Sequence, residues 1–138
     1  MSHFTYLKTS FQNLLYLEKA LNRLNIIYKH QKDIINDSNF ENSNLNLNLI
    51  INQSNGYDIK FDWNGQEYEL VADMSFWQKP YPPETFREKV GQEYAGELIS
   101  GEGQKTGFQL IHYKQNSDGS KTVILERWNN TPTNIINL

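Results

Sequence analysis

The sequence of 138 residues contains no cysteine, and this absence excludes several classes of protein at once. Without a thiol, the chain has no disulfide framework, no thiolate metal cluster and no cysteine nucleophile. Basic residues are also few, since 13 Lys and Arg stand against 16 Asp and Glu and give a formal net charge of −3. Because domains that bind nucleic-acid phosphates usually carry an excess of basic residues, the sequence predicts no nucleic-acid partner.

Long apolar runs are absent as well. No run reaches the roughly 18 residues that a membrane helix needs, so we expect no membrane span. The first ten residues, MSHFTYLKTS, lack the apolar centre of a secretory signal. A chain of this length buries about two-thirds of the surface that its unfolded form exposes, which is enough for a core. These features predict one domain over residues 1–128 and a loosely ordered tail over residues 129–138.

Apolar residues recur with helical spacing in two segments. The first segment has one apolar stripe and could be capped by Ser10; the stripe consists of Phe11, Leu14, Leu17, Leu21 and Leu24. The second segment, residues 83–100, begins with a proline, which suits the first turn of a helix. Gly101 and Gly103 are expected to end it. The sequence therefore predicts two helices.

The clearest strand signal surrounds Asn64-Gly65, a pair that favours a two-residue type I′ hairpin turn. This turn predicts a register in which Phe61 faces Tyr68, Ile59 faces Leu70 and Tyr57 faces Ala72. The apolar partners then lie on one side of the hairpin, as expected for a face that covers a core.

Further strands are predicted at residues 3–8, 26–28, 45–50, 108–114 and 121–128 from alternating apolar and polar residues. The turn between the last two strands leaves two registers open, in which Ile111 faces either Leu125 or Glu126, and we prefer Leu125. The order of elements is β-α-β-β-β-β-α-β-β. Because hairpins dominate this order, the predicted fold class is α+β, with a mostly antiparallel sheet and both helices packed on one face.

The most suggestive candidate site follows the predicted hairpin, where aromatic residues and prolines are interleaved. We select Asp73, Phe76, Trp77 and Tyr81 as candidate binding residues. Aromatic side chains on a stiff loop lose little entropy on docking and commonly anchor protein interfaces. The structural alternatives are that Asp73 caps a turn and that Phe76 and Trp77 belong to the core.

No catalytic or metal-binding set is evident. His3, His30 and His112 lie far apart in sequence and lack the short spacings typical of metal sites. Ser75 lacks the G-x-S-x-G setting of a hydrolase nucleophile. We therefore expect no metal, no cofactor and no catalytic residue.

Five short segments stand in a fixed order along the chain: MSHFTYLKT, YDIKF, YELVADMSFW, VGQEYA and VILERW. Together they resemble the family of hypothetical chloroplast reading frame thirty-five, carried by algal plastids and cyanobacteria. The resemblance covers residues 1–128 and implies a plastid-encoded protein, which needs no import signal. The family has no established activity, so the resemblance implies no catalytic residues.

We therefore expect a non-enzymatic, protein-binding accessory or assembly factor in the plastid stroma, whose partner is another plastid protein. The alternative is a small-molecule-binding protein or enzyme with a cleft near residues 73–81. A ligand site predicts a deep pocket lined by Asp73, Trp77 and His3, whereas an interaction module predicts a flat apolar patch.

Overall fold

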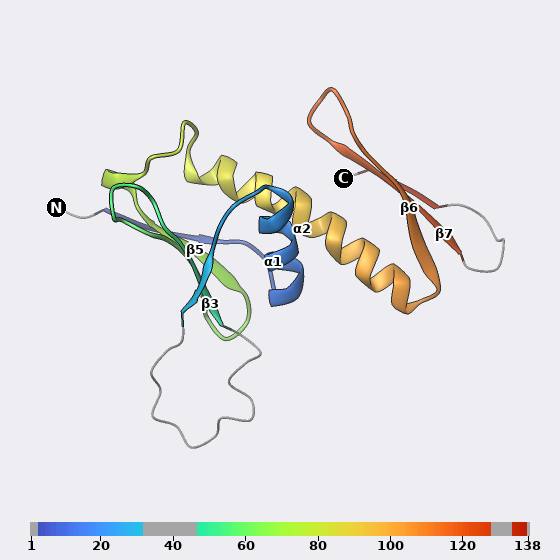
Figure 1. Ribbon diagram of the computed structural model, residues 1–138, viewed down its shortest axis with the longest axis horizontal. Helices are drawn as coiled ribbons and strands as arrows, with labels where there is room; N and C mark the ends of the chain where they lie inside the picture. Colours follow the sequence, from blue (N-terminus) through green and yellow to red (C-terminus); the bar gives the residue numbers. More distant parts are fainter. Residues whose placement is uncertain (1–2, 32–46, 128–133, 138) are drawn as a thin grey trace, which may run out of the picture. The chain divides into compact units, whose positions relative to one another are not determined.

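The computed structural model describes residues 3–31, 47–127 and 134–137, and Figure 1 shows the course of the chain. The chain divides into two compact units, Met1–Gly91 and Gln92–Leu138. This boundary falls inside the segment that the sequence analysis assigns to one domain. Each unit contains an antiparallel sheet, and the elements follow the predicted order with one strand added at the end. The α+β fold class is therefore confirmed.

A five-stranded sheet with the spatial order β1-β5-β4-β3-β2 forms the frame of the first unit. All four neighbouring pairs are antiparallel. The strands are β1 (Phe4–Lys8), β2 (Lys29–Gln31), β3 (Asn48–Ile51), β4 (Ile59–Trp63) and β5 (Tyr68–Asp73). Strand β2 begins directly after the segment 26–28 predicted from the sequence.

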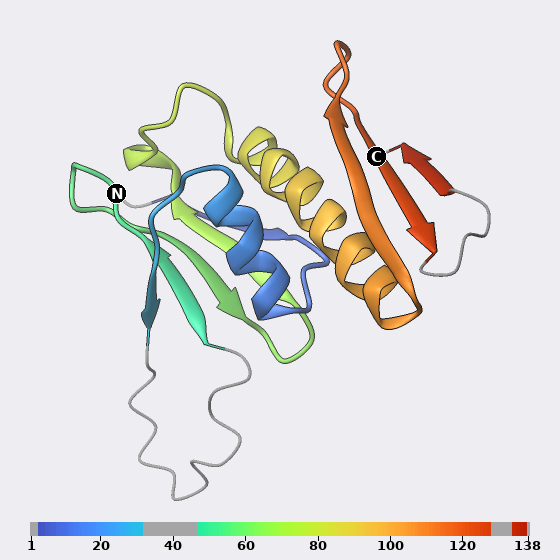
Figure 2. The ribbon, with the colours of Figure 1, turned by 45° about the vertical axis from the view of Figure 1, so that its right-hand side comes forward.

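Two helices cover one face of this sheet, as predicted. They are α1 (Leu14–Arg23) and the first turns of α2, which spans Pro83–Lys105 (Figures 1 and 2). The core between the layers is fully buried and includes Leu17, Leu21, Leu49, Ile59, Phe61, Leu70, Phe86 and Val90. Burying one such side chain contributes about 1.5–3 kcal/mol relative to leaving it exposed. The apolar stripes identified in the sequence therefore form this core.

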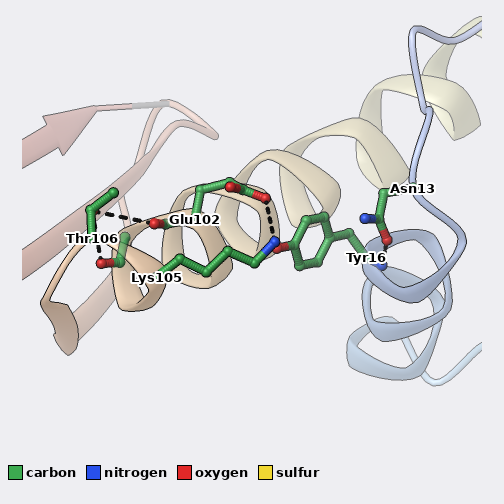
Figure 3. Close-up of polar contacts among 6 residues, drawn as sticks. Asn13, Tyr16, Glu102, Lys105 and Thr106 are labelled. Atoms are coloured by element: carbon green, nitrogen blue, oxygen red, sulfur yellow. Dashed lines mark hydrogen bonds and ion pairs between the residues drawn. The ribbon is translucent and has the colours of Figure 1, made fainter.

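Helix α1 begins later than predicted, and Ser10 is not its cap. Asn13 is the N-cap, and its Oδ1 accepts the backbone N–H of Tyr16 at 3.2 Å (Figure 3). Ser10 instead adopts a left-handed conformation with φ of 65°, and its N–H donates to a carboxylate oxygen of Glu67 at 3.0 Å. The chain therefore turns at Ser10, and the short polar side chain three residues later takes over the capping role.

The turn between β4 and β5 is longer than predicted. The structure pairs Phe61 with Leu70 and Trp63 with Tyr68, so the loop contains four residues rather than two. The side-chain oxygen of Asn64 accepts the N–H groups of Gln66 and Glu67, both at 2.9 Å, which stabilises the longer loop. The predicted pairing of Phe61 with Tyr68 and of Ile59 with Leu70 is therefore wrong. The register shifts by two residues, and an even shift leaves the same side chains facing the core.

A three-stranded sheet, ordered β6-β7-β8, belongs to the second unit. Its strands are β6 (Phe108–Gln115), β7 (Lys121–Arg127) and β8 (Asn134–Asn137). Both neighbouring pairs are antiparallel. Strand β8 lies in the part of the chain predicted to be a loosely ordered tail, to which the sequence analysis assigned no strand.

Helix α2 does not end at residue 100, because it continues through Gly101 and Gly103 to Lys105. A Cβ atom at Gly103 would lie 3.4 Å from both Leu125 Cδ1 and Phe108 Cβ. The glycine therefore allows the helix to pack closely against the β6–β7 hairpin, and this contact outweighs a propensity cost of about 1 kcal/mol.

The helix ends just after this contact. The hydroxyl of Thr106 donates to the backbone oxygens of Glu102 and Gly103, at 3.3 and 3.0 Å (Figure 3). Gly107 then takes a positive φ of 91°, a conformation that favours glycine after a helix. The chain can thus leave the helix and enter β6 directly.

The β6–β7 register also differs from both predicted alternatives. Leu110 pairs with Leu125 and His112 with Ile124, so the strand shifts register between them. Ile111 lies in this irregularity and faces neither Leu125 nor Glu126. Our preferred pairing of Ile111 with Leu125 is therefore wrong. A bulge cannot be deduced from alternation of residue types, because it changes the alternation itself.

Replacing Gly91 by Ala should stabilise the protein by about 0.5–1 kcal/mol, because alanine has the higher helix propensity. A Cβ atom there would lie 3.6–3.7 Å from two ring carbons of Phe11, an ordinary packing distance. Urea denaturation would measure the gain. Gly103→Ala is the matched contrast, with a smaller gain or a loss because of its tighter surroundings, and an equal gain at both positions would contradict the packing argument.

Candidate functional site

The four residues selected from the sequence lie in one stretch that joins β5 to α2. Asp73 ends β5, and a short 3-10 turn, η2, covers Met74–Phe76. Asp73 is buried, and its Oδ1 accepts the backbone N–H groups of Ser75 and His3, each at 3.0 Å. The carboxylate therefore caps the turn and ties it to the segment that enters β1.

Phe76 stacks flat against Tyr57, a residue from the loop between β3 and β4. The ring centroids are 3.6 Å apart, and the planes differ by 2°. Tyr57 is 44% exposed, whereas Phe76 is half-buried. The predicted pairing of Tyr57 with Ala72 is wrong, because β4 begins only at Ile59, and the contact with Phe76 was missed. The polar run before it, Gln53 to Gly56, was the available signal for a loop.

A set of side-chain hydrogen bonds holds this loop to the segment after β5. Gln53 Nε2 and Asn55 Nδ2 both donate to the backbone oxygen of Phe76, at 3.2 and 2.8 Å. In return, the N–H of Gln78 donates to Gln53 Oε1 at 2.9 Å, and Ser54 Oγ donates to Gln78 Oε1 at 2.9 Å. We call residues 52–58 and 74–82 together the loop pair. These hydrogen bonds hold the two loops side by side, so that together they form one continuous surface.

Trp77 anchors the loop pair to helix α2. Its ring packs edge-on against Phe86, with centroids 5.8 Å apart, and its Nε1 donates to the backbone oxygen of Tyr81 at 2.6 Å. The ammonium of Lys89 lies 5.3 Å from the centre of the Tyr81 ring. Trp77 and Tyr81 are both half-buried. The structure thus brings Phe76, Trp77 and Tyr81 into one rigid segment.

Tyr28 and Asp118, both outside the loop pair, have displaced pKa values. Burial raises the pKa of Tyr28, and the nearby charge of Glu18 raises it further. Hydrogen bonds from Ser120 lower the pKa of Asp118, an exposed residue of the β6–β7 loop. A shallow depression of about 580 Å³ lies at the end of α1 and is lined by Asn22, Asn25, Ile26, Ile27 and Tyr28. None of the four predicted binding residues lines it.

The histidines are scattered in the fold. His3 precedes β1, while His30 lies in β2 and contacts the carboxylate of Glu18. Within residues 3–31, 47–127 and 134–137, no three His, Asp or Glu side chains are arranged to hold a metal ion. In the same ranges no helix has the length and apolar character required to cross a membrane.

Comparison with known proteins gives a consistent family. A model described as protein of unknown function, DUF1257, matches residues 20–124. An uncharacterized protein ycf35 from Trieres chinensis is 56% identical over 122 residues, which are 88% of this chain and 94% of the relative. Proteins of the same name from Guillardia theta and Cyanophora paradoxa are 38% and 37% identical, over 93% of this chain and 98% of each relative.

No solved structure matches the chain significantly. The alignments nevertheless cover nearly the whole length of the sequence relatives, and the family model matches most of this chain. They confirm the resemblance that the five short segments indicated. The chain therefore belongs to the ycf35 (DUF1257) family.

Proposed function

We propose that this protein is a non-enzymatic protein-binding module, an accessory or assembly factor of the plastid stroma, and that its loop pair docks another plastid protein through an apolar patch. Membership of a family of plastid-encoded reading frames supports the compartment. The main support for a docking surface at the loop pair is that Gln53 and Asn55 both donate hydrogen bonds to the backbone oxygen of Phe76 and so hold the two loops together.

A surface fixed in this way is suited to binding. Association costs free energy when loops and side chains must be ordered, and a preorganised surface avoids much of that cost. The stacked rings of Tyr57 and Phe76 offer an aromatic platform at the surface of the loop pair, and Met74, two residues before Phe76, is also exposed. Aromatic residues and methionine are enriched at interfaces. The surface therefore supports recognition of a partner through shape and apolar contact.

The same geometry gives less support to the alternative, a small-molecule site near residues 73–81. Asp73 would have to supply the charged group of such a site. Its Oδ1 already accepts two backbone N–H groups, and the side chain is buried. A carboxylate used in this way fixes backbone structure, so we assign Asp73 to positioning of the loop pair.

The proposal can be tested by affinity capture from a stromal extract with the tagged full chain. We expect a defined set of proteins whose recovery falls roughly fivefold or more with Tyr57→Ala, the loss expected for a residue worth above 1 kcal/mol. Leu15→Ala is the control, because Leu15 is exposed on α1 and remote in sequence from the loop pair. The assignment would be refuted if the wild-type protein captured nothing above background. It would also be refuted if the Tyr57→Ala variant recovered the same proteins in the same amounts as the wild type.

Replacing Tyr81 by Ala should weaken partner binding while changing the melting temperature by less than about 2 °C, as expected for a substitution outside the core. The hydrogen bond from Trp77 reaches the backbone oxygen of Tyr81, so the substitution retains the acceptor. Differential scanning calorimetry and the same capture assay measure the two effects. Trp77→Ala should lower the melting temperature more, since it removes the contact with Phe86. A large loss of stability in Tyr81→Ala would show that Tyr81 belongs to the core.

A further inference from the structure

Strand β1 forms one edge of the five-stranded sheet. Its five residues pair in continuous register with β5, from Phe4 opposite Asp73 to Lys8 opposite Glu69. The strand contains no proline, and its pairing has no bulge. Proline, bulges and several charged residues are the usual means by which natural proteins prevent an edge from pairing with another chain, and β1 has only Lys8 among these.

The hydrogen bonds at both ends of β1 show which residues point their backbone groups outward. The backbone oxygen of His3 accepts the N–H of Met74 at 2.7 Å, whereas the backbone oxygen of Lys8, at the other end, accepts Arg87 Nη1 at 3.2 Å. In an antiparallel pair, bonded and non-bonded positions alternate. The odd-numbered residues therefore face β5, and Phe4, Tyr6 and Lys8 direct their N–H and C=O groups away from the sheet.

The side chains of the same residues extend this edge into an aromatic surface. Phe4 and Tyr6 are 59% and 64% exposed, and their ring centroids lie 6.5 Å apart. Side chains alternate between the two faces along a strand, and Leu7 pairs with Leu70 on the helix-covered face, so Phe4 and Tyr6 lie on the opposite face. Two exposed aromatic rings beside an outward-facing strand edge are unusual for a surface that meets only water.

The opposite edge of the sheet is built differently. Strand β2 has three residues, and two of them, Lys29 and His30, are exposed and polar. A short edge with a lysine is a protected edge. The contrast shows that exposure of apolar rings is a property of β1 and not of the sheet as a whole.

We propose that β1 pairs antiparallel with β1 of a second copy of this protein, about a two-fold axis at Tyr6, and so joins the two five-stranded sheets. In this register Tyr6 faces its counterpart, and Phe4 faces Lys8 of the second copy. Every one of the five residues of β1 then has a cross-strand neighbour. A two-fold axis at Thr5 or Leu7 would pair only three residues of each strand.

Charge and chemistry favour this register. No like charges stand opposite each other, since each Lys8 meets a phenylalanine ring, over which its apolar stem and its ammonium group can both pack. The backbone oxygen of Lys8 accepts Arg87 Nη1 at 3.2 Å, but a carbonyl oxygen has two lone pairs and can accept the second strand as well. The interface is small, so the dimer should be a weak one.

Sedimentation equilibrium across a range of about 1 to 100 µM, which brackets weak association, tests the proposal. The wild-type chain should approach twice its 16.2 kDa mass as concentration rises. Tyr6→Lys should remain monomeric, and so should Tyr6→Pro, in which the lost N–H is one that does not bond β5. Ile27→Lys, at another exposed apolar position, should dimerise like the wild type. A monomeric wild type, or a dimer that both folded Tyr6 variants retain, overturns the proposal.

Introduced cysteines test the register independently, because the chain has no native thiol. In the proposed dimer the Cα atoms at position 6 lie about 5.5 Å apart. Those at position 4 lie roughly 14 Å apart, because they are four residues apart along the strand direction and belong to neighbouring strands. A short cross-linker with two thiol-reactive groups, such as a bis-maleimide, should therefore trap Tyr6→Cys as a dimer much faster than Phe4→Cys. Equal rates, or no trapped dimer from either variant, would contradict the two-fold axis at Tyr6 even if Tyr6→Lys lowered the apparent mass.

Discussion

Replacing Lys121 by Met should lower the free energy of unfolding by about 3–5 kcal/mol, because it leaves a buried carboxylate without the ammonium group that compensates it. Lys121 Nζ contacts Glu93 Oε1, and the two side chains are only 6% and 9% exposed. The pair joins the start of β7 to the middle of α2, next to the bond from Gln92 Nε2 to the backbone oxygen of Gly119 at 2.8 Å. Urea denaturation followed by circular dichroism would measure the loss.

The double variant Lys121→Met with Glu93→Leu separates the charge from the packing. Removing both charges avoids an uncompensated buried ion, so the double variant should have a higher free energy of unfolding than Lys121→Met alone. Its loss of stability should also be much smaller than the sum of the losses in Lys121→Met and Glu93→Leu. Lys105→Met serves as the exposed control, since Lys105 pairs with Glu102 at 3.2 Å on the surface, where such pairs contribute little (Figure 3). If Lys121→Met and Lys105→Met cost the same, burial of the pair would not determine its energy.

Replacing Phe61 by Ala should cost about 3–5 kcal/mol, the range for deleting a large buried aromatic side chain. Phe61 is fully buried in the centre of the first sheet, and its ring centroid lies 6.2 Å from that of Phe11 and 6.3 Å from that of Phe86. Truncation would therefore open a cavity between the sheet, the segment before α1 and the first turns of α2. Thermal and urea denaturation would each show the loss.

Phe61→Leu is the matched comparison, because it retains most of the apolar volume and should cost less than half as much. An additional test uses small apolar molecules, which stabilise a dry cavity when they fill it. A loss in Phe61→Ala below about 1.5 kcal/mol would mean that the surrounding rings collapse into the space.

The sequence predicts well those helices and strands that bury one face, because the spacing of their apolar residues marks that face. The stripe containing Leu17 and Leu21 and the alternation of Ile59 and Phe61 both mark faces that the structure buries. Periodicity reports which side of a helix or strand leaves water, and it does so without any knowledge of the partner. For this reason the order of elements and the fold class could be predicted, including the positions of both helices.

The details that the sequence misses depend on contacts between distant residues or on single side chains. Whether Ser10 or Asn13 caps α1 depends on the bond between Ser10 and Glu67, a residue 57 positions later in the sequence, in the turn before β5. The extension of α2 depends on Gly103 meeting Leu125. Neither contact leaves a local pattern in the sequence, and local propensity alone gives the opposite expectation in both places.

The candidate site shows the same division. Prolines and aromatics predicted a stiff segment around Phe76, Trp77 and Tyr81, and the structure shows that segment pinned in place. The role of Tyr57 could not be predicted, since it belongs to a separate loop whose position depends on Gln53 and Asn55. A site assembled from two loops is visible only when the fold brings the loops together.

The loop at Asn64 has a consequence for the chemical ageing of the protein. An asparagine followed by glycine deamidates readily when the next backbone nitrogen can attack its side-chain amide. Here that amide is restrained by three hydrogen bonds, two accepted from Gln66 and Glu67 and one donated to Glu69 at 2.9 Å. The folded loop should slow the reaction, whereas the unfolded chain has no such restraint. The fraction of molecules in which Asn64 has been converted to aspartate would then increase with the time that the protein has spent unfolded.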